Sequence, residues 1–355
     1  LPARLTLARI NLTRREFAAA LQATKEILNL DPRNLQARLL QAQAYIGIGN
    51  FEQSRQEILE AIKQYPASAD AVLHLALLDV QEKKYKEAED LLGKLHHSNP
   101  GDLRAALGLS EASALQNQFD KAIKLLNSEL AKQPDRADLR IGVANLEVRA
   151  GRYDAAVAEF KKVLEQNPKS SDLHISIGET YRRKGDMASA VAHFRKAKDL
   201  SPNDARPLVP LAVLLDSSGQ KAEAKATYEH ILKLQPDNPI ALNNLAYMIA
   251  ETGGDLDQAL ALAQRAKQKL PQNPDVADTL GWIYIKKNLS DNAVEIFREL
   301  VSKQPTNSTF HFHLAMALYQ KGDKPQAKKE CQAALQSNPS QEEAAKIKEL
   351  LAKLG

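Results

Sequence analysis

The sequence has little of what most enzymes and membrane proteins need. Its 355 residues include one cysteine, Cys331, so no disulfide can form within the chain. Aromatic residues make up only 5% of it, and no apolar run approaches the roughly 20 residues of a membrane span. The 48 basic and 44 acidic residues are interspersed, which excludes the single-sign field typical of nucleic-acid binding. Ala, Leu, Gln, Lys and Glu dominate instead, and these residues favour helices.

Sequence motifs of catalysis are also missing. None of GxGxxG, GxxxxGK[ST], GxSxG, HExxH or CxxC occurs, so we predict no enzymatic activity, no cofactor and no metal site. His96 and His97 end a predicted helix, where imidazoles interact with terminal carbonyls. His311 and His313 fall on different faces of a helix, which is a poor metal geometry. Cys331 is expected to be a buried, unreactive thiol.

Prolines reveal an internal period of 34 residues. The prolines that carry it are Pro32, Pro66, Pro100, Pro134, Pro168, Pro202, Pro236, Pro271, Pro305 and Pro339. The one interval of 35 residues contains Gly253 and Gly254, which suit an inter-helix turn with one extra residue. Because proline cannot continue a helix, each marks the end of a repeat. Such a period predicts a repeat array.

Aligned on these prolines, two positions of every repeat hold a small residue. Position 8 is Ala8, Ala42, Ala76, Ser110, Ala144, Gly178, Ala212, Ala246, Gly281 and Ala315, and position 20 is Ala20, Ser54, Ala88, Ala122, Ala156, Ala190, Ala224, Ala259, Ala293 and Ala327. Small residues at fixed positions predict two antiparallel helices that cross closely. An Ala→Leu change there should destabilise the fold by about 1–3 kcal/mol through overpacking.

The repeat pattern resembles the tetratricopeptide repeat over essentially the whole chain. Its aromatic positions are filled by Tyr45, Tyr181 and Tyr284 at position 11, and by Phe160, Phe194, Tyr228 and Phe297 at position 24. The Trp that the family favours at position 4 is absent. The resemblance implies an all-α, right-handed superhelical α-solenoid, with ten helix-turn-helix repeats over residues 1–339.

Residues 340–355 depart from the repeat pattern. Ser340 and Glu343 form a predicted capping box, and Ile347, Leu350, Leu351 and Leu354 form one apolar stripe. We interpret the segment as a C-terminal capping helix, which would make this end of the chain genuine. No such cap precedes Leu1, so further repeats or another domain are expected before it.

The resemblance also indicates where a partner would bind. In this family, positions 2, 5, 6, 9, 12 and 13 of the first helices line the concave surface. Position 5 never holds the Lys that clamps a chaperone's C-terminal carboxylate, which argues against that role. The last three repeats carry a polar and aromatic set there: Asn243, Asn244, Tyr247, Asp278, Thr279, Trp282, Phe312, His313 and Met316. Asn244 offers a donor and an acceptor to a peptide, and Tyr247 and Trp282 offer flat faces. Alternatively, these aromatics only pack on neighbouring repeats.

Two further features concern the same surface. Arg149, Arg182 and Arg183 form a second candidate site, for carboxylates or phosphates, with a solvated helix end as the alternative. Pro210 falls at position 6 of repeat seven and is expected to bend the groove there.

Ten repeats in phase, without a catalytic motif, predict a scaffold that binds a protein or peptide segment in its concave groove. The run at 243–288 resembles a repeat pair of bacterial envelope proteins in exopolysaccharide export and protein sorting, which favours a periplasmic or envelope location over the cytoplasm. Two alternatives stay open. The array could be the regulatory or substrate-recruiting arm of a larger enzyme, or it could bind polysaccharide directly through Tyr247 and Trp282. Neither nucleic acid nor a membrane span is predicted.

Overall fold

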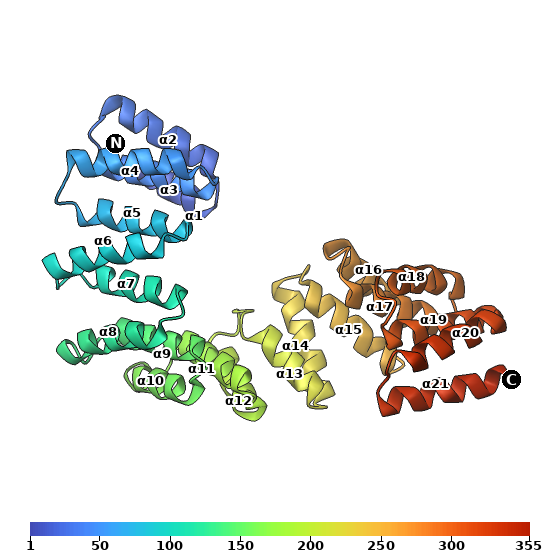
Figure 1. The fold of residues 1–355 in the computed structure, drawn as a ribbon. Helices are drawn as coiled ribbons and strands as arrows, with labels where there is room; N and C mark the ends of the chain where they lie inside the picture. The colour runs from blue at the N-terminus through green and yellow to red at the C-terminus, as the bar shows by residue number, and fades with distance from the viewer. The chain divides into compact units, whose positions relative to one another are not determined.

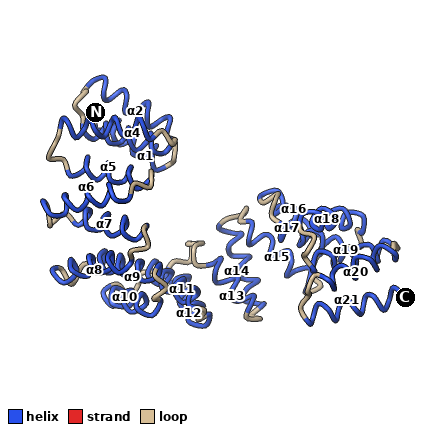
Figure 2. The backbone as a smooth tube through the Cα atoms, viewed as in Figure 1, coloured by secondary structure: helices blue, strands red, loops and turns tan.

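The computed structural model describes residues 1–355 and contains 21 α-helices and no strand (Figures 1 and 2). It divides into two compact units, Leu1–Lys169 and Ser170–Gly355. The helices of the first unit are α1 (Pro2–Thr13), α2 (Phe17–Leu30), α3 (Leu35–Gly47), α4 (Phe51–Gln64), α5 (Ala69–Gln81), α6 (Tyr85–Ser98), α7 (Leu103–Leu115), α8 (Phe119–Lys132), α9 (Ala137–Arg149) and α10 (Tyr153–Gln166). Those of the second are α11 (Ser171–Lys184), α12 (Met187–Leu200), α13 (Leu208–Ser217), α14 (Lys221–Leu234), α15 (Pro239–Glu251), α16 (Leu256–Lys269), α17 (Pro274–Lys286), α18 (Ser290–Lys303), α19 (Ser308–Lys321), α20 (Lys324–Gln336) and α21 (Gln341–Leu354).

Each unit is a stack of helical hairpins, as the period of 34 residues predicts. From α1 to α20, odd-numbered helices are the first helices of the repeats and even-numbered helices the second, and consecutive helices pack on each other within each unit. First helices of adjacent repeats also touch within a unit, for example α15 with α17 and α17 with α19. The first helices therefore line up side by side from α1 to α9 in the first unit and from α15 to α19 in the second. None of the helices is both long enough and apolar enough to span a bilayer.

The turn residues explain where the helices begin and end. Asn238, Asn273 and Asn307 precede α15, α17 and α19, and each side-chain oxygen accepts a hydrogen bond from the backbone N–H three residues later. Within the repeats, Gly185 and Gly322 end α11 and α19 with φ of 89° and 90°. Glycine adopts this left-handed conformation without strain. Gly253, in the turn predicted for the interval of 35 residues, also has a positive φ, of 70°.

The small residues at positions 8 and 20 lie at the crossing of the two helices in each repeat. All ten residues at position 20 are fully buried. At position 8, a Cβ atom added to Gly281 would lie 2.6 Å from the ring of Phe297, and one added to Gly178 would lie 3.0 Å from Phe194. The aromatic rings at position 24 therefore fill the space that glycine leaves at position 8 of the same repeat.

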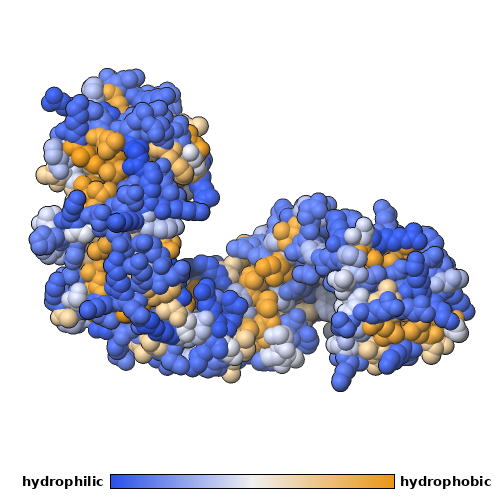
Figure 3. Space-filling view, viewed as in Figure 1, coloured by the Kyte–Doolittle hydropathy of each residue, from blue (hydrophilic) through white to orange (hydrophobic).

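Repeat seven differs from the others at its first helix. Helix α13 has only 10 residues, whereas α11 and α15 have 14 and 13. Pro207 precedes it, and Pro210 lies in its first turn, where a backbone N–H has no intrahelical acceptor to lose. The helix that contains Pro210 therefore starts late, and the bend of the groove expected there stays a prediction. In the view of Figure 3, apolar side chains gather over α13 and α14.

Helix α21 covers the end of the last repeat. The Ser340 hydroxyl accepts a hydrogen bond of 3.1 Å from the N–H of Glu343, as the capping box predicts. The Glu343 carboxylate accepts a second bond from the hydroxyl of Ser308 at the start of α19, so it docks the helix onto repeat ten. Ile347 and Leu354 are among the buried residues of its apolar stripe.

Candidate partner-binding groove

Three consecutive first helices and the final helix enclose a groove of about 420 Å³ in the second unit. Its lining residues are Asn243, Asn244, Tyr247 and Glu251 of α15, Asp275, Asp278, Thr279 and Trp282 of α17, Thr309, Phe312 and His313 of α19, and Lys346 of α21. Eight of the nine groove residues predicted from the last three repeats belong to this lining. The exception is Met316, which is half-buried and packs against the apolar core of the C-terminal repeats.

Trp282 is held in the groove by contacts to three helices. Its indole Nε1 donates a hydrogen bond of 2.8 Å to Glu251 of α15. The imidazole of His313 lies 4.9 Å from its ring centroid, and the ammonium group of Lys286 lies 4.8 Å from it. Lys286 also forms an ion pair of 3.2 Å with Glu251. His313 and Lys286 therefore already cover part of the indole, and that part of its surface is unavailable to a ligand.

Tyr247 is the more accessible aromatic residue. It is 42% exposed, whereas Trp282 is only partly exposed. Partial burial of its ring, together with the carboxylates of Glu251 and Asp278, raises the pKa of the Tyr247 phenol. Its phenol is therefore uncharged at neutral pH, and its side chain is accessible to a partner.

His313 joins two repeats across the groove. Its Nδ1 lies 2.7 Å from a carboxylate oxygen of Asp278. Its ring packs edge-to-face with that of Phe297, and the two ring centroids are 5.3 Å apart. The predicted groove residues of α17 and α19 are therefore tied to each other, and this fixes the separation of the two helices at the groove.

The two asparagines of α15 form a short chain of amides. Asn243 donates a hydrogen bond of 3.1 Å to the Asn244 oxygen, and Asn244 donates one of 2.8 Å to the hydroxyl of Tyr228. Tyr228 is fully buried, and this burial raises the pKa of its phenol to about 12. One donor and the acceptor of Asn244 are thus used inside the protein, which leaves less for a partner than its sequence position suggests. The side-chain oxygen of Asn243 accepts no hydrogen bond.

Sequence reasoning missed five residues of this site. Glu251, Asp275 and Thr309 occupy positions 13, 2 and 2 of their first helices, which the family pattern assigns to the concave surface, so the signal was present. Tyr228 supplies a hydroxyl at position 24, where repeats five, six and nine have Phe, and that difference was the signal for it. Lys346 lies on α21, outside the repeat register, so no repeat position could indicate it.

The predicted arginine site is not part of the groove. Arg182 and Arg183 on α11 both pair with Glu179, at 2.7 and 3.1 Å, and they lower the pKa of its carboxyl. Arg149, in the first unit, pairs with Glu111 at 2.6 Å. Each guanidinium already has a carboxylate partner on a helix surface. This arrangement agrees with the alternative interpretation, in which these arginines belong to solvated helix ends and do not bind a ligand.

Outside the groove, His96 and His311 have carboxylate partners and Cys331 is buried in the core. His96 lies 3.3 Å from the buried carboxylate of Glu129, and His311 lies 2.6 Å from Glu330. Cys331 is fully buried, and burial raises the pKa of its thiol to about 11. The thiol is therefore protonated at neutral pH, and the prediction that it is buried is confirmed.

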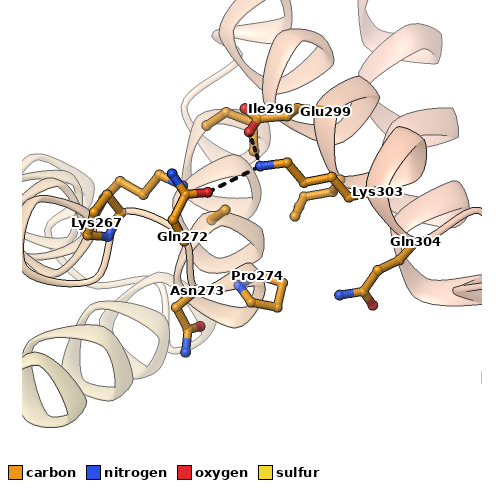
Figure 4. A pocket seen from close by; sticks show the side chains of 11 residues that line it. Lys267, Gln272, Asn273, Pro274, Ile296, Glu299, Lys303 and Gln304 are labelled. Carbon is orange, nitrogen blue, oxygen red and sulfur yellow. Dashed lines mark hydrogen bonds and ion pairs between the residues drawn. The ribbon is translucent and has the colours of Figure 1, made fainter.

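A smaller cavity of about 90 Å³ lies between α18 and the loop before α17 (Figure 4). Lys303 crosses it and bonds to Glu299 at 2.6 Å and to Gln272 at 3.4 Å. The loop at 66–69 and α6 enclose a cavity at the same repeat positions in the first unit. Because it recurs, this cavity follows from the packing of the repeats, whereas the groove has a lining of its own.

Comparisons with solved structures give likenesses of low identity. A chain of the APC/C hetero-tetramer Cut9–Hcn1 is 15% identical, and the match covers 99% of this chain and 83% of that chain with a TM-score of 0.49. YrrB, a TPR protein with an unusual peptide-binding site, is 18% identical, and the match covers 54% of this chain and 97% of YrrB with a TM-score of 0.46. A tetratricopeptide repeat protein from Parabacteroides merdae is 15% identical, and the match covers 70% of this chain and 96% of that protein with a TM-score of 0.48. No curated protein matches the sequence.

Models of the tetratricopeptide repeat family match the sequence itself. One matches residues 144–205 and 210–274, and another matches 11–78, 79–146 and 290–354. The matched ranges cover more than half of the chain and follow the repeats described above. This protein therefore belongs to the tetratricopeptide-repeat family.

Proposed function

We propose that this protein is a non-catalytic scaffold that holds an extended segment of a partner protein in the groove of repeats eight to ten. The fold supports a role in protein–protein interaction in general. The observation that carries the specific proposal is the groove, because it gathers hydrogen-bonding and aromatic side chains from three successive first helices and from α21. Its length along the stack suits an extended chain, whose backbone offers donors and acceptors at regular spacing.

A saccharide ligand is the alternative from another chemical class. Sugar rings stack on free aromatic faces, and the groove contains Tyr247 and Trp282 for that purpose. The contacts of Trp282 with His313 and Lys286 reduce the area that it offers to a sugar. Tyr247 alone is then the exposed platform, and this favours the peptide over the saccharide.

The biological setting that we propose is a bacterial envelope or export assembly. Its support is the resemblance of the run at 243–288 to a repeat pair of bacterial envelope proteins, and this run contains most of the groove. Cell fractionation of the native source tests the setting: recovery of the protein in the cytoplasm alone contradicts it. A catalytic domain encoded upstream of Leu1 would instead make the array the recruiting arm of a larger enzyme.

Fluorescence of Trp282, the only tryptophan, tests the function directly. We would titrate the chain with pooled nine-residue peptides and then with oligosaccharides. A saturable change with peptides that is lost in Tyr247→Ala supports the proposal. Tyr319→Ala is the matched control, because Tyr319 is 37% exposed but does not line the groove. Binding of oligosaccharides only, or peptide binding that Tyr247→Ala leaves unchanged, contradicts it.

A further inference from the structure

The groove carries more negative than positive charge, although the chain as a whole has a net charge of +4. Three carboxylates line it, those of Glu251, Asp275 and Asp278, against the single ammonium group of Lys346. Lys346 forms an ion pair of 2.7 Å with Glu342 on its own helix, and Glu251 forms one of 3.2 Å with Lys286. The negative charge without a Lys or Arg partner is therefore that of Asp275 and Asp278. Because the groove departs in sign from the rest of the protein, its charge calls for a local explanation.

Helix geometry does not account for these carboxylates. Asp275 lies in the first turn of α17, where the helix dipole favours a negative charge. Glu251, however, is the last residue of α15, where the dipole disfavours one. Asp278 is the fifth residue of α17 and lies beyond its first turn. Two of the three carboxylates thus occupy positions that helix stability does not select.

Hydrogen-bond acceptors remain available in the groove. One oxygen of Glu251 is used by Trp282 and Lys286, and one oxygen of Asp278 is used by His313. The other oxygen of each of these two carboxylates, and both oxygens of Asp275, form no ion pair within the protein. Such a lining is complementary to a ligand that is rich in donors.

We infer that the groove selects a partner segment with a basic side chain, Lys or Arg, which lies against Tyr247 and pairs with Asp275 and Asp278. The inference rests on the proposed function and specifies its ligand. The exposed face of Tyr247 attracts a cation through the ring quadrupole, and the carboxylates supply charge-assisted hydrogen bonds. Partial burial is the main cause of the raised pKa of the Tyr247 phenol, and the carboxylates of Glu251 and Asp278 add to it.

An array of nine-residue peptides of random composition, probed with the full chain, tests the inference. Peptides whose capture is lost in Tyr247→Ala should be enriched in Lys and Arg. For one such peptide labelled with fluorescein, replacing the basic residue with Gln should weaken binding about tenfold in anisotropy titrations, because a cation–π contact and a charged hydrogen bond are lost together. Binding should also weaken as salt is raised.

Asp275→Asn is the decisive variant, because Asp275 forms no ion pair within the protein and its change should leave the fold intact. It should weaken the basic peptide several-fold. Asp291→Asn is the control, since Asp291 is an exposed residue in the first turn of α18 outside the groove and the change in charge is the same. Its ion pair with the exposed Lys321 is lost in this variant, so the stability of both variants is measured as well. Asp275→Lys should restore binding to the same peptide with Glu in place of its basic residue.

The outcomes separate the inference from the function that it specifies. Peptides that need Tyr247 but show no preference for Lys or Arg overturn the inference and leave the groove as a peptide site. Basic peptides that bind Asp275→Asn, Asp291→Asn and the unmodified chain equally well also overturn it, because the attraction is then unspecific. If no peptide depends on Tyr247, the inference and the proposed function both fail.

Discussion

Asn244 in the groove donates a hydrogen bond of 2.8 Å to the hydroxyl of Tyr228, which is fully buried between α14 and α15. This hydrogen bond connects the surface that we propose for binding to the core of repeat seven. Because the amide is oriented from below by a core residue, its direction in the groove is set before a partner arrives. Preorganisation of this kind lowers the entropic cost of binding.

Asn244→Ala should destabilise the protein by about 1–3 kcal/mol, since it leaves the buried Tyr228 hydroxyl without a partner. Tyr228→Phe should cost about 1 kcal/mol. The double variant should be more stable than the sum of the two effects predicts, because both remove the same bond. Urea unfolding of the four proteins measures this coupling, and strictly additive effects would show that the bond contributes nothing.

Gly281→Ala and Gly93→Ala should have opposite effects on stability. The added Cβ at position 281 would lie 2.6 Å from the buried ring of Phe297, so overpacking should destabilise the protein by about 1–3 kcal/mol. A Cβ at Gly93, inside α6, meets nothing within 4 Å, so helix propensity should stabilise it by up to about 1 kcal/mol. Thermal unfolding compares the two, and equal effects would contradict the assigned packing.

Alkaline pH should weaken the second unit. Burial raises the pKa of Cys331 from about 9 to about 11, and that of Tyr228 from about 10 to about 12. Groups whose pKa is raised on folding contribute stability below their unfolded pKa and lose it as pH rises toward the folded value. Stability should therefore fall between about pH 9 and 12. Tyr228→Phe and Cys331→Ala should flatten this dependence, and an unchanged slope in both would rule out these groups as its cause.

Glu251→Ala should move the emission of Trp282 to longer wavelength, because it removes the carboxylate that covers the indole N–H and holds Lys286 over the ring, and water then reaches the indole. The neighbouring ion pair of Asp257 with Lys287 does not touch the indole, so Asp257→Ala serves as the control. An emission spectrum that is the same in both variants would mean that Glu251 does not fix the indole.

The sequence pattern predicted the repeats and the first-helix residues of the groove because both follow from one period. When every repeat places the same positions on the same face, a residue such as Asp278 can be assigned to the groove from its register alone. The pattern could not predict which side chains satisfy each other. The contacts of Trp282 with His313 and Glu251 join three repeats, and register carries no information on rotamers.

Helix starts and the end of the array were harder to predict for a related reason. In repeat seven, Pro210 occupies a position that is helical in the other repeats. The late start of α13 follows from Pro207 and Pro210 together, and Pro210 alone did not indicate it. Lys346 reaches the groove from a helix that has no counterpart in the other repeats. Its place depends on how α21 docks, which the bond between Ser308 and Glu343 helps to determine.

The contribution of α21 to the groove has a consequence for how such an array can change in evolution. Repeats can be duplicated or deleted within a solenoid because each one packs mainly on its neighbours. A duplication inserted between repeat ten and α21 would move Lys346 away from Asp275 and Tyr247 and would divide the groove. Under the function proposed for the groove, the last three repeats and α21 are therefore expected to be retained together as one block.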